Sequence, residues 1–217
     1  LIARPGPQDD FKVVDSFSRI VRLGEGVART GLLSEAALAR TIAALKICAE
    51  RIGRLHVTHV RAVVTQAGRL ARNADVLIAR ARAETGIELN VISAEDEADL
   101  AATGCAPLIG KDYKGALVFD IGGGSTEIIL LTRTDGGFGK RLIASVPVGV
   151  VSVAEEAGGG DFPALRAAMD ARFAPCRAAT DNLFDATAQH LLGTSGTVTT
   201  LAAIALGLPR YNRARVD

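Results

Sequence analysis

The chain has 217 residues, of which 48% are hydrophobic and only 4% aromatic, so Ala, Val, Leu and Ile must build most of its core. Its 25 basic and 24 acidic residues give a formal net charge of +1, which argues against a protein that coats nucleic acid. No apolar run reaches the ~18 residues that span a bilayer, so we expect no membrane segment. This length suits one large domain or two small ones.

The first half of the chain alternates between strand and helix patterns. Ser34 is a good N-cap, and apolar residues after it recur at helical spacing up to a glycine, Gly53. Ser93 precedes a second well-marked helix, whose first turn is acidic, as the helix dipole favours. In chain order we predict a strand at 11–23, a helix at 35–51, a strand at 57–65, a helix at 74–85, a strand at 87–92 and a helix at 94–103. Residues 1–4 read as the end of a further strand.

A segment rich in Gly, Pro and Lys follows at 104–115, and we place a domain boundary at 105–114. This gives domain I at 1–107 and domain II at 114–217. In domain II we predict strands at 116–119, 127–132 and 140–146, a helix at 161–183, a strand at 190–192 and a helix at 198–206. The order βββαβα is the core of a ribonuclease-H-like domain, and domain I follows the same plan with a shortened opening hairpin.

Three consecutive glycines separate the first two strands of domain II. The stretch reads Asp120-Ile-Gly-Gly-Gly-Ser-Thr-Glu127. Glycines let the backbone turn sharply and bring its N–H groups close to a ligand, and two carboxylates beside them suit a phosphate with its magnesium ion. A Rossmann or Walker loop would instead open a helix. A glycine turn between strands that holds phosphate is typical of actin-like folds.

The three cysteines, Cys48, Cys105 and Cys176, are odd in number and lack Cys-x-x-Cys spacing. They predict reduced, buried thiols in a cytoplasmic protein, without a disulfide framework or a zinc site. His56 and His59 could imitate a metal pair, but no third ligand is near them in sequence, and surface histidines are the preferred interpretation.

Several segments together resemble the exopolyphosphatase/guanosine pentaphosphate phosphatase family. The segment at 120–127 is similar to its second phosphate loop, and the matching segments elsewhere are 22–26, 65–73, 91–100 and 193–200. The resemblance implies an α/β protein with two ribonuclease-H-like (actin-like) domains, each a mixed five-stranded sheet flanked by helices, with a cleft between them. It also implies release of the terminal phosphate of inorganic polyphosphate, guanosine pentaphosphate or both, by a cytoplasmic homodimer that binds no nucleic acid and no membrane.

The resemblance assigns roles to individual residues. Glu97 is the position of the general base, and Asp120 and Glu127 are the positions of ligands for Mg²⁺ or Mn²⁺. Phosphate-binding positions are Gly122, Gly123, Gly124, Ser125, Arg69, Ser195 and Gly196. Arg22 and Arg72 are lesser candidates, and for Arg72 we prefer a solvated helix face.

Each assignment has a plainer alternative. Glu97 could be only a helix-start acid, Glu127 an exposed strand residue, and the glycines a simple hairpin turn. Ser195 or Thr197 could merely cap a helix. At the level of function, an acetate- or sugar-kinase-like phosphotransferase and a non-catalytic binder of polyphosphate or guanosine tetraphosphate remain open.

The sequence departs from the family pattern in three places. The family's first loop, of the type Asp-x-Gly-Ser/Thr-Asn, would lie before Leu1, and Asp99 stands where the family usually has Arg. The chain stops at Asp217, before the segment that normally completes the second domain. We therefore expect residues 1–217 alone to hydrolyse polyphosphate poorly.

Overall fold

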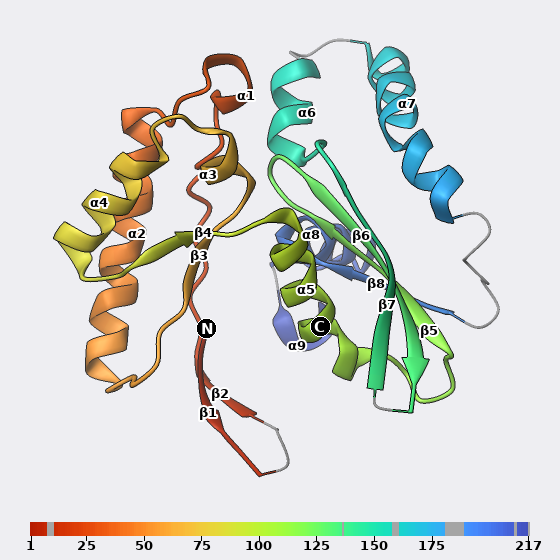
Figure 1. Cartoon of the computed structure of the whole chain (residues 1–217), viewed down its shortest axis with the longest axis horizontal. Coiled ribbons are helices and arrows are strands. Elements are labelled where there is room, and N and C mark those ends of the chain that lie inside the picture. Colours follow the sequence, from red (N-terminus) through yellow and green to blue (C-terminus); the bar gives the residue numbers. More distant parts are fainter. Residues whose placement is uncertain (8–10, 136, 158–160, 181–188, 211, 217) are drawn as a thin grey trace. The chain divides into compact units, whose positions relative to one another are not determined.

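The computed structural model describes residues 1–7, 11–135, 137–157, 161–180, 189–210 and 212–216 (Figure 1). Contacts divide the chain into two compact units, Leu1–Ile92 and Ser93–Asp217, here called unit 1 and unit 2. None of the helices in the described ranges combines the length and the apolar character of a membrane span.

Both units contain strands and helices. The strands are β1 Ile2–Pro5, β2 Phe11–Asp15, β3 Ala62–Val64, β4 Leu89–Val91, β5 Gly115–Ile121, β6 Thr126–Thr134, β7 Gly137–Val146 and β8 Gln189–Thr194. The helices are α1 Val27–Thr30, α2 Glu35–Arg54, α3 Gln66–Leu70, α4 Ala74–Thr85, α5 Ala94–Cys105, the 3₁₀ turn η1 Ala106–Leu108, α6 Val150–Ala157, α7 Phe162–Thr180, α8 Ser195–Ala205 and α9 Arg213–Val216.

The described residues of unit 1 include four strands, which form two pairs. β1 and β2 are antiparallel, whereas β3 and β4 are parallel. The strands of this unit are shorter than predicted, because a strand continues only while a neighbouring strand pairs with it. β4 has three residues, Leu89–Val91, and they pair with Ala62–Val64 of β3. The remainder of the predicted strand at 57–65 has no partner among the described residues and is irregular.

The two long helices of unit 1 pack through their apolar stripes. Leu38 and Ile42 of α2 and Leu77 and Ala81 of α4 are each at most 2% exposed and belong to one core. The start of α2 is fixed as the sequence predicts, because the Ser34 hydroxyl accepts a hydrogen bond from the Ala37 amide at 3.2 Å. The predicted and observed bounds of α4 coincide.

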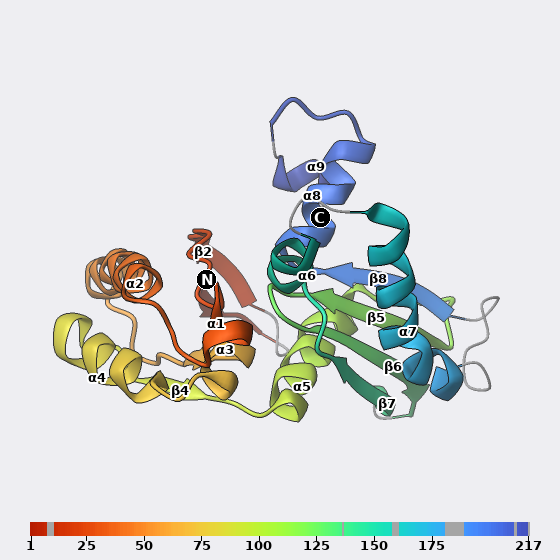
Figure 2. The same ribbon diagram turned by 90° about the horizontal axis from the view of Figure 1, so that it is seen from above.

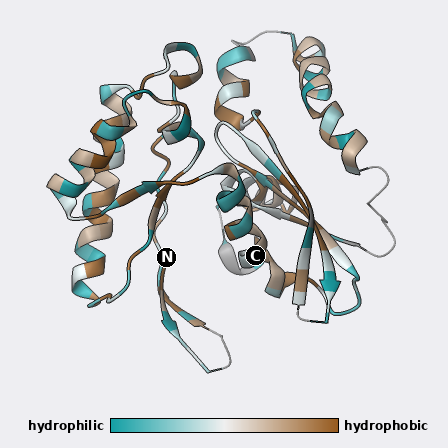
Figure 3. Cartoon of the chain, viewed as in Figure 1, coloured by the Kyte–Doolittle hydropathy of each residue, from teal (hydrophilic) through white to brown (hydrophobic). Residues whose placement is uncertain are grey.

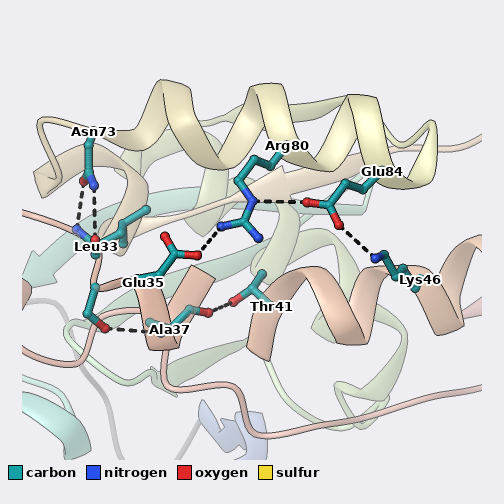
Figure 4. Close-up of polar contacts among 9 residues, drawn as sticks. Leu33, Glu35, Ala37, Thr41, Lys46, Asn73, Arg80 and Glu84 are labelled. Carbon is teal, nitrogen blue, oxygen red and sulfur yellow. Dashed lines mark hydrogen bonds and ion pairs between the residues drawn. The ribbon is translucent and has the colours of Figure 1, made fainter. Parts of the chain in front are cut away.

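Polar contacts join the same two helices along their exposed side (Figure 4). Arg80 reaches Glu35 at 2.6 Å and Glu84 at 3.1 Å, and Lys46 reaches Glu84 at 2.8 Å. At the other end, the Asn73 amide exchanges two hydrogen bonds with the Leu33 backbone, at 2.8 and 3.1 Å.

Unit 2 is built on a four-stranded sheet in the order β7-β6-β5-β8. β5 and β6 are antiparallel, as are β6 and β7, while β8 runs parallel to β5. All four strands were predicted, and they account for four of the five expected in each sheet. Figure 2 shows α5 and α7 on opposite sides of this sheet.

Side-chain alternation gives the sheet two apolar faces. Figure 3 shows brown, hydrophobic stretches along its strands. On one face, residues of β5 and β6 pack against α5; this cluster comprises Ala98, Ala102, Cys105, Ile109, Ala116, Val118, Ile129 and Leu131. On the other face, Val146, Val148 and Cys176 form a smaller cluster with Met169 and Phe173 of α7. Cys105 and Cys176 are buried, as predicted, and Cys48 is half-buried.

The division between the units lies earlier than the predicted boundary at 105–114. The prediction assigned α5 to domain I, but Ala98, Ala102 and Cys105 of α5 pack on the sheet of unit 2. The chain therefore passes from one unit to the other at Ile92–Ser93, directly before the acidic first turn of α5.

Two differences in unit 2 concern helices: α6 was not predicted, and α8 begins at Ser195 instead of at residue 198. The helix predicted at 161–183, with Asp161 as its cap, is observed as Phe162–Thr180, which confirms its start. Its last three predicted residues lie outside the described ranges.

Candidate active site in unit 2

The glycine turn connects β5 to β6 as an antiparallel hairpin, which confirms the predicted strand–turn–strand. Ile121 and Thr126 form the last pair of the ladder, and the Gly122 amide donates to the Ser125 carbonyl at 2.9 Å. None of the three glycines has a positive φ. A left-handed backbone is therefore not the reason for glycine in this turn.

The turn packs directly on the start of α6, and Gly149 before that helix makes the close approach possible. The Gly122 carbonyl accepts from Val150 at 3.1 Å, and the Gly123 carbonyl accepts from Val151 at 2.7 Å. A Cβ on Gly149 would lie 2.3 Å from the Gly124 nitrogen, closer than real Cβ atoms come to other atoms. The first amides of α6 are thus satisfied by the turn's carbonyls.

The same arrangement leaves amides of the turn available. Within the described residues, no group accepts a hydrogen bond from the Gly123 or Gly124 amide. Ser125 beside them is only 4% exposed. Backbone donors held this way are suited to anionic oxygens.

A row of polar residues crosses the sheet at the level of this turn. Asp120 of β5 lies directly opposite Glu127 of β6, and Glu127 lies opposite Ser145 of β7. On its other side Asp120 pairs with Thr194 of β8. The Ser145 hydroxyl donates to Glu127 Oε1 at 2.9 Å. Because Glu127 is 1% exposed, the interpretation of this residue as an exposed strand position is wrong.

The surroundings of Asp120 disfavour the ionised form of its carboxyl group. Burial, followed by the negative charges of Glu127 and Glu97, raises its pKa from 3.8 to about 6. Ser195 acts in the opposite direction and lowers the pKa. The Ser195 hydroxyl has one proton and donates it to the Ile121 carbonyl at 2.8 Å, so its support for Asp120 is limited. Like charges directly opposite on adjacent strands destabilise a sheet unless something neutralises them.

Glu97 is brought to this face of the sheet by α5. The Ser93 hydroxyl accepts from the Asp96 amide at 2.9 Å and fixes the helix start, as the sequence predicts. Ala98 is fully buried on the face that carries Asp120 and Glu127, and Glu97 precedes it in the first turn. Its electrostatic effect on the Asp120 pKa shows that the two carboxylates lie within range of each other.

The end of β8 completes the same edge of the sheet. Because β8 is parallel to β5, its last residues arrive beside Asp120. Ser195 has a positive φ of 84°, an unusual backbone for a residue with a side chain, and its hydroxyl bonds Ile121 instead of capping α8. A Cβ on Gly193 would lie 2.6 Å from the Phe119 ring, whereas a Cβ on Gly196 would meet nothing within 4 Å.

The remaining predicted site residues lie in unit 1. One guanidinium nitrogen of Arg69, in α3, donates to the Ile92 carbonyl at 3.1 Å. Arg72 is exposed and donates to the Thr30 carbonyl at 3.2 Å, and Arg22 is exposed with a positive φ of 48°. His56 and His59 are both exposed, as preferred from the sequence. The structure thus groups Glu97, the turn, the two strand carboxylates, Ser195 and Gly196 in one unit, and assigns the arginines to the other.

Two residues of the site were missed by the sequence analysis. Ser145 was counted only as a residue of a predicted strand, because its importance depends on the register of β7 against β6. Gly149 lies directly before an unpredicted helix, and a glycine between Val148 and Val150 was the one available signal.

We expect Asp120→Asn to raise the free energy of unfolding of the metal-free protein at pH 7 by about 1–2 kcal/mol. A shift from 3.8 to about 6 corresponds to roughly 3 kcal/mol, reduced because the carboxyl is only partly buried. The folded state holds this proton more tightly than the unfolded state, so wild-type stability falls as pH rises from about 4 to about 6 and is not lost further above that window.

Denaturation in EDTA at pH 3.5 and pH 7 measures this effect. The difference between Asp120→Asn and wild type should vanish at the lower pH. Asp112→Asn removes an exposed carboxylate from the same unit and is the matched control, with no pH-dependent difference expected. A difference of equal size at both pH values would contradict the electrostatic explanation.

Comparisons with known proteins identify the family of this chain. The model of the Ppx/GppA phosphatase family matches residues 1–213. The chain is 34% identical over 211 residues to Exopolyphosphatase 2 of Mycobacterium tuberculosis, covering 92% of this chain and 63% of that protein. It therefore spans less than two thirds of that relative's length.

Solved structures give the same result. An exopolyphosphatase from Cytophaga hutchinsonii superposes with a TM-score of 0.82 at 25% identity, covering 94% of this chain and 65% of that one. The Aquifex aeolicus member of the Ppx/GppA family superposes with a TM-score of 0.71 at 29% identity, covering 99% and 67%. With the hairpin turn, the opposed carboxylates and the α/β architecture in place, the chain belongs to the Ppx/GppA phosphatase family and has its actin-like fold.

Proposed function

We propose that the protein containing this chain releases the terminal phosphate of inorganic polyphosphate, with unit 2 carrying the reactive carboxylates. The observation behind the proposal is the pair of Asp120 and Glu127, opposed in register beside a turn with available amides, with Glu97 on the same face. The 34% identical relative is named an exopolyphosphatase. Guanosine pentaphosphate presents the same terminal group and is included as a second substrate.

A divalent cation, Mg²⁺ or Mn²⁺, fits the chemistry of the donor set. Asp120 and Glu127 would supply hard oxygen ligands, and a bound cation would relieve their mutual repulsion. Among the described residues no group of three or more His, Cys, Asp or Glu surrounds a metal position. Mg²⁺ is commonly held by one or two carboxylates plus substrate phosphates and water, so two are sufficient. When bound, the cation would neutralise phosphate charge.

The chain's own residues have separate tasks in this proposal. The amides of Gly123, Gly124 and Gly196, with the Ser125 hydroxyl, hold phosphate oxygens. The Gly122 amide and the Ser195 hydroxyl donate to the Ser125 and Ile121 carbonyls and keep the turn and the end of β8 in place. Arg69, in unit 1, has a planar, charged guanidinium group whose geometry suits phosphate. Glu97 accepts a proton from the water that attacks the terminal phosphorus, and the phosphoanhydride bond breaks. The products are orthophosphate and a polyphosphate one unit shorter. A homodimer and a cytoplasmic location, expected from the resemblance, stay predictions.

The decisive experiment supplies the full-length protein with Mg²⁺ and polyphosphate and measures orthophosphate release over time. We expect stepwise release of single phosphates, abolished by EDTA and by Asp120→Asn. Tight polyphosphate binding without release would support a non-catalytic binder. ATP-dependent phosphorylation of acetate or a sugar, without hydrolysis, would support a phosphotransferase. Either result would overturn the proposal.

A further inference from the structure

Ser145 is an exposed residue whose hydroxyl contacts a deeply buried carboxylate. It lies near the end of β7, directly opposite Glu127 of β6. Its Oγ donates to Glu127 Oε1 at 2.9 Å, whereas Glu127 is only 1% exposed. Because Ser145 itself is exposed, its side chain contributes little to the packing of the sheet. The side chain of Ser145 therefore acts mainly through its hydrogen bond to Glu127.

A buried glutamate needs such a donor for two physical reasons. An ionised carboxylate out of water is costly unless it is hydrogen-bonded, and hydrogen bonds to ionised groups are roughly twice as strong as neutral ones. The glutamate side chain also has several rotatable bonds, and a fixed partner reduces their freedom before a ligand arrives. The neighbour on the opposite side, Asp120, is a carboxylate and cannot serve as donor when ionised.

Across the sheet, a hydroxyl donor therefore comes first, at Ser145 of β7. Two carboxylate acceptors follow it, Glu127 of β6 and Asp120 of β5. The donor holds one oxygen of Glu127, and a cation bound by this carboxylate would use its remaining acceptor capacity. Residues that orient ligands through a hydrogen bond commonly change metal affinity by about 10–100-fold when they are removed.

We propose that Ser145 is a positioning residue that holds the Glu127 carboxylate in the orientation required to bind the divalent cation. This inference rests on the proposed function for the location of the cation, but it does not depend on the identity of the substrate. It makes Ser145 part of the metal site through Glu127, without contact to substrate.

The test measures Mn²⁺ binding to the full-length protein by calorimetry, without substrate. We expect Ser145→Ala to raise the Kd for Mn²⁺ about tenfold or more, and Ser145→Thr, which keeps the hydroxyl, to remain within about threefold of wild type. In phosphate-release assays, Ser145→Ala should require more metal for half-maximal rate and recover most of kcat at saturating metal. Thr132→Val is the matched control, since it removes a hydroxyl of β6 for which the described residues offer no hydrogen-bond partner.

The outcomes separate this proposal from the proposed function. If Ser145→Ala binds Mn²⁺ like wild type, or if Ser145→Thr is as weak as Ser145→Ala, the positioning role is overturned. If Ser145→Ala loses kcat that excess metal does not restore, while its Mn²⁺ affinity is unchanged, Ser145 contacts the substrate. This result would also overturn the positioning role. Mn²⁺ binding that depends on Ser145 in a protein that releases no phosphate would overturn the proposed function alone. Absence of Mn²⁺ binding by wild type would overturn both.

Discussion

Replacing Glu97 by Gln in the full-length protein is expected to lower kcat by ~10²–10⁴ and to leave substrate binding largely intact. Gln keeps the size and polarity of Glu97 but cannot accept the proton of the attacking water, and loss of a general base has costs of this size. Ser93 still caps α5, and buried Ala98 still packs on the sheet, so the helix remains in place. Steady-state phosphate release at saturating polyphosphate measures kcat. Equilibrium binding of polyphosphate under conditions that prevent turnover measures its affinity.

Glu95→Gln is the matched control for this experiment. Glu95 belongs to the same first turn of α5 and has the same charge, but it is exposed. The kcat of Glu95→Gln should fall less than about twofold. An exposed charge in the first turn of a helix contributes only modestly to its stability, so α5 and Glu97 keep their places. If Glu97→Gln retains most of its turnover, or if Glu95→Gln is equally impaired, Glu97 is only a helix-start acid.

Gly149→Ala is expected to reduce kcat/KM by ~10²-fold and to lower the free energy of unfolding by about 1–3 kcal/mol. The new methyl group would lie 2.3 Å from the Gly124 nitrogen and 2.4 Å from the Gly123 carbonyl carbon, which are backbone atoms with no rotamer to change. The turn or the start of α6 must therefore move, and a misplacement of ~1 Å at a reactive centre has a cost of this order. Activity and chemical denaturation assays check the two effects.

Gly104→Ala provides the comparison for Gly149→Ala. Gly104 is an exposed residue of α5 in the same unit, and a Cβ there would meet nothing within 4 Å. It should be neutral or stabilising by about 0.5–1 kcal/mol, as for glycine replaced in a helix interior. Full activity in Gly149→Ala would show that the turn does not need its present position.

Local signals were sufficient to predict most elements and part of the site. Helix caps act within a few residues, so Ser34 and Ser93 located the starts of α2 and α5 correctly. The apolar runs around the glycine turn predicted β5 and β6 as a hairpin, and the ladder of that hairpin brings Asp120 opposite Glu127. These features depend on short stretches of chain, in which period and turn chemistry are decisive.

Other features depend on contacts between distant segments, and sequence patterns do not reveal these. The link between Ser145 and Glu127 requires the register of β7, which shifts between Leu130 and Leu131. The closeness of Gly149 to the turn requires the position of α6. The predicted domain boundary differs from the division between the units because a Gly- and Pro-rich segment marks a break in the chain, whereas the packing of α5 decides which unit it joins.

The membership of α5 in unit 2 has an evolutionary consequence. The three carboxylates of Glu97, Asp120 and Glu127 lie on α5, β5 and β6, which pack together in one core. Their mutual geometry is therefore preserved as long as this core is preserved. Arg69 belongs to the other unit and is anchored there at the Ile92 carbonyl. Under the proposed function, sequence change in unit 1 can therefore accumulate without altering how the three carboxylates of unit 2 are arranged.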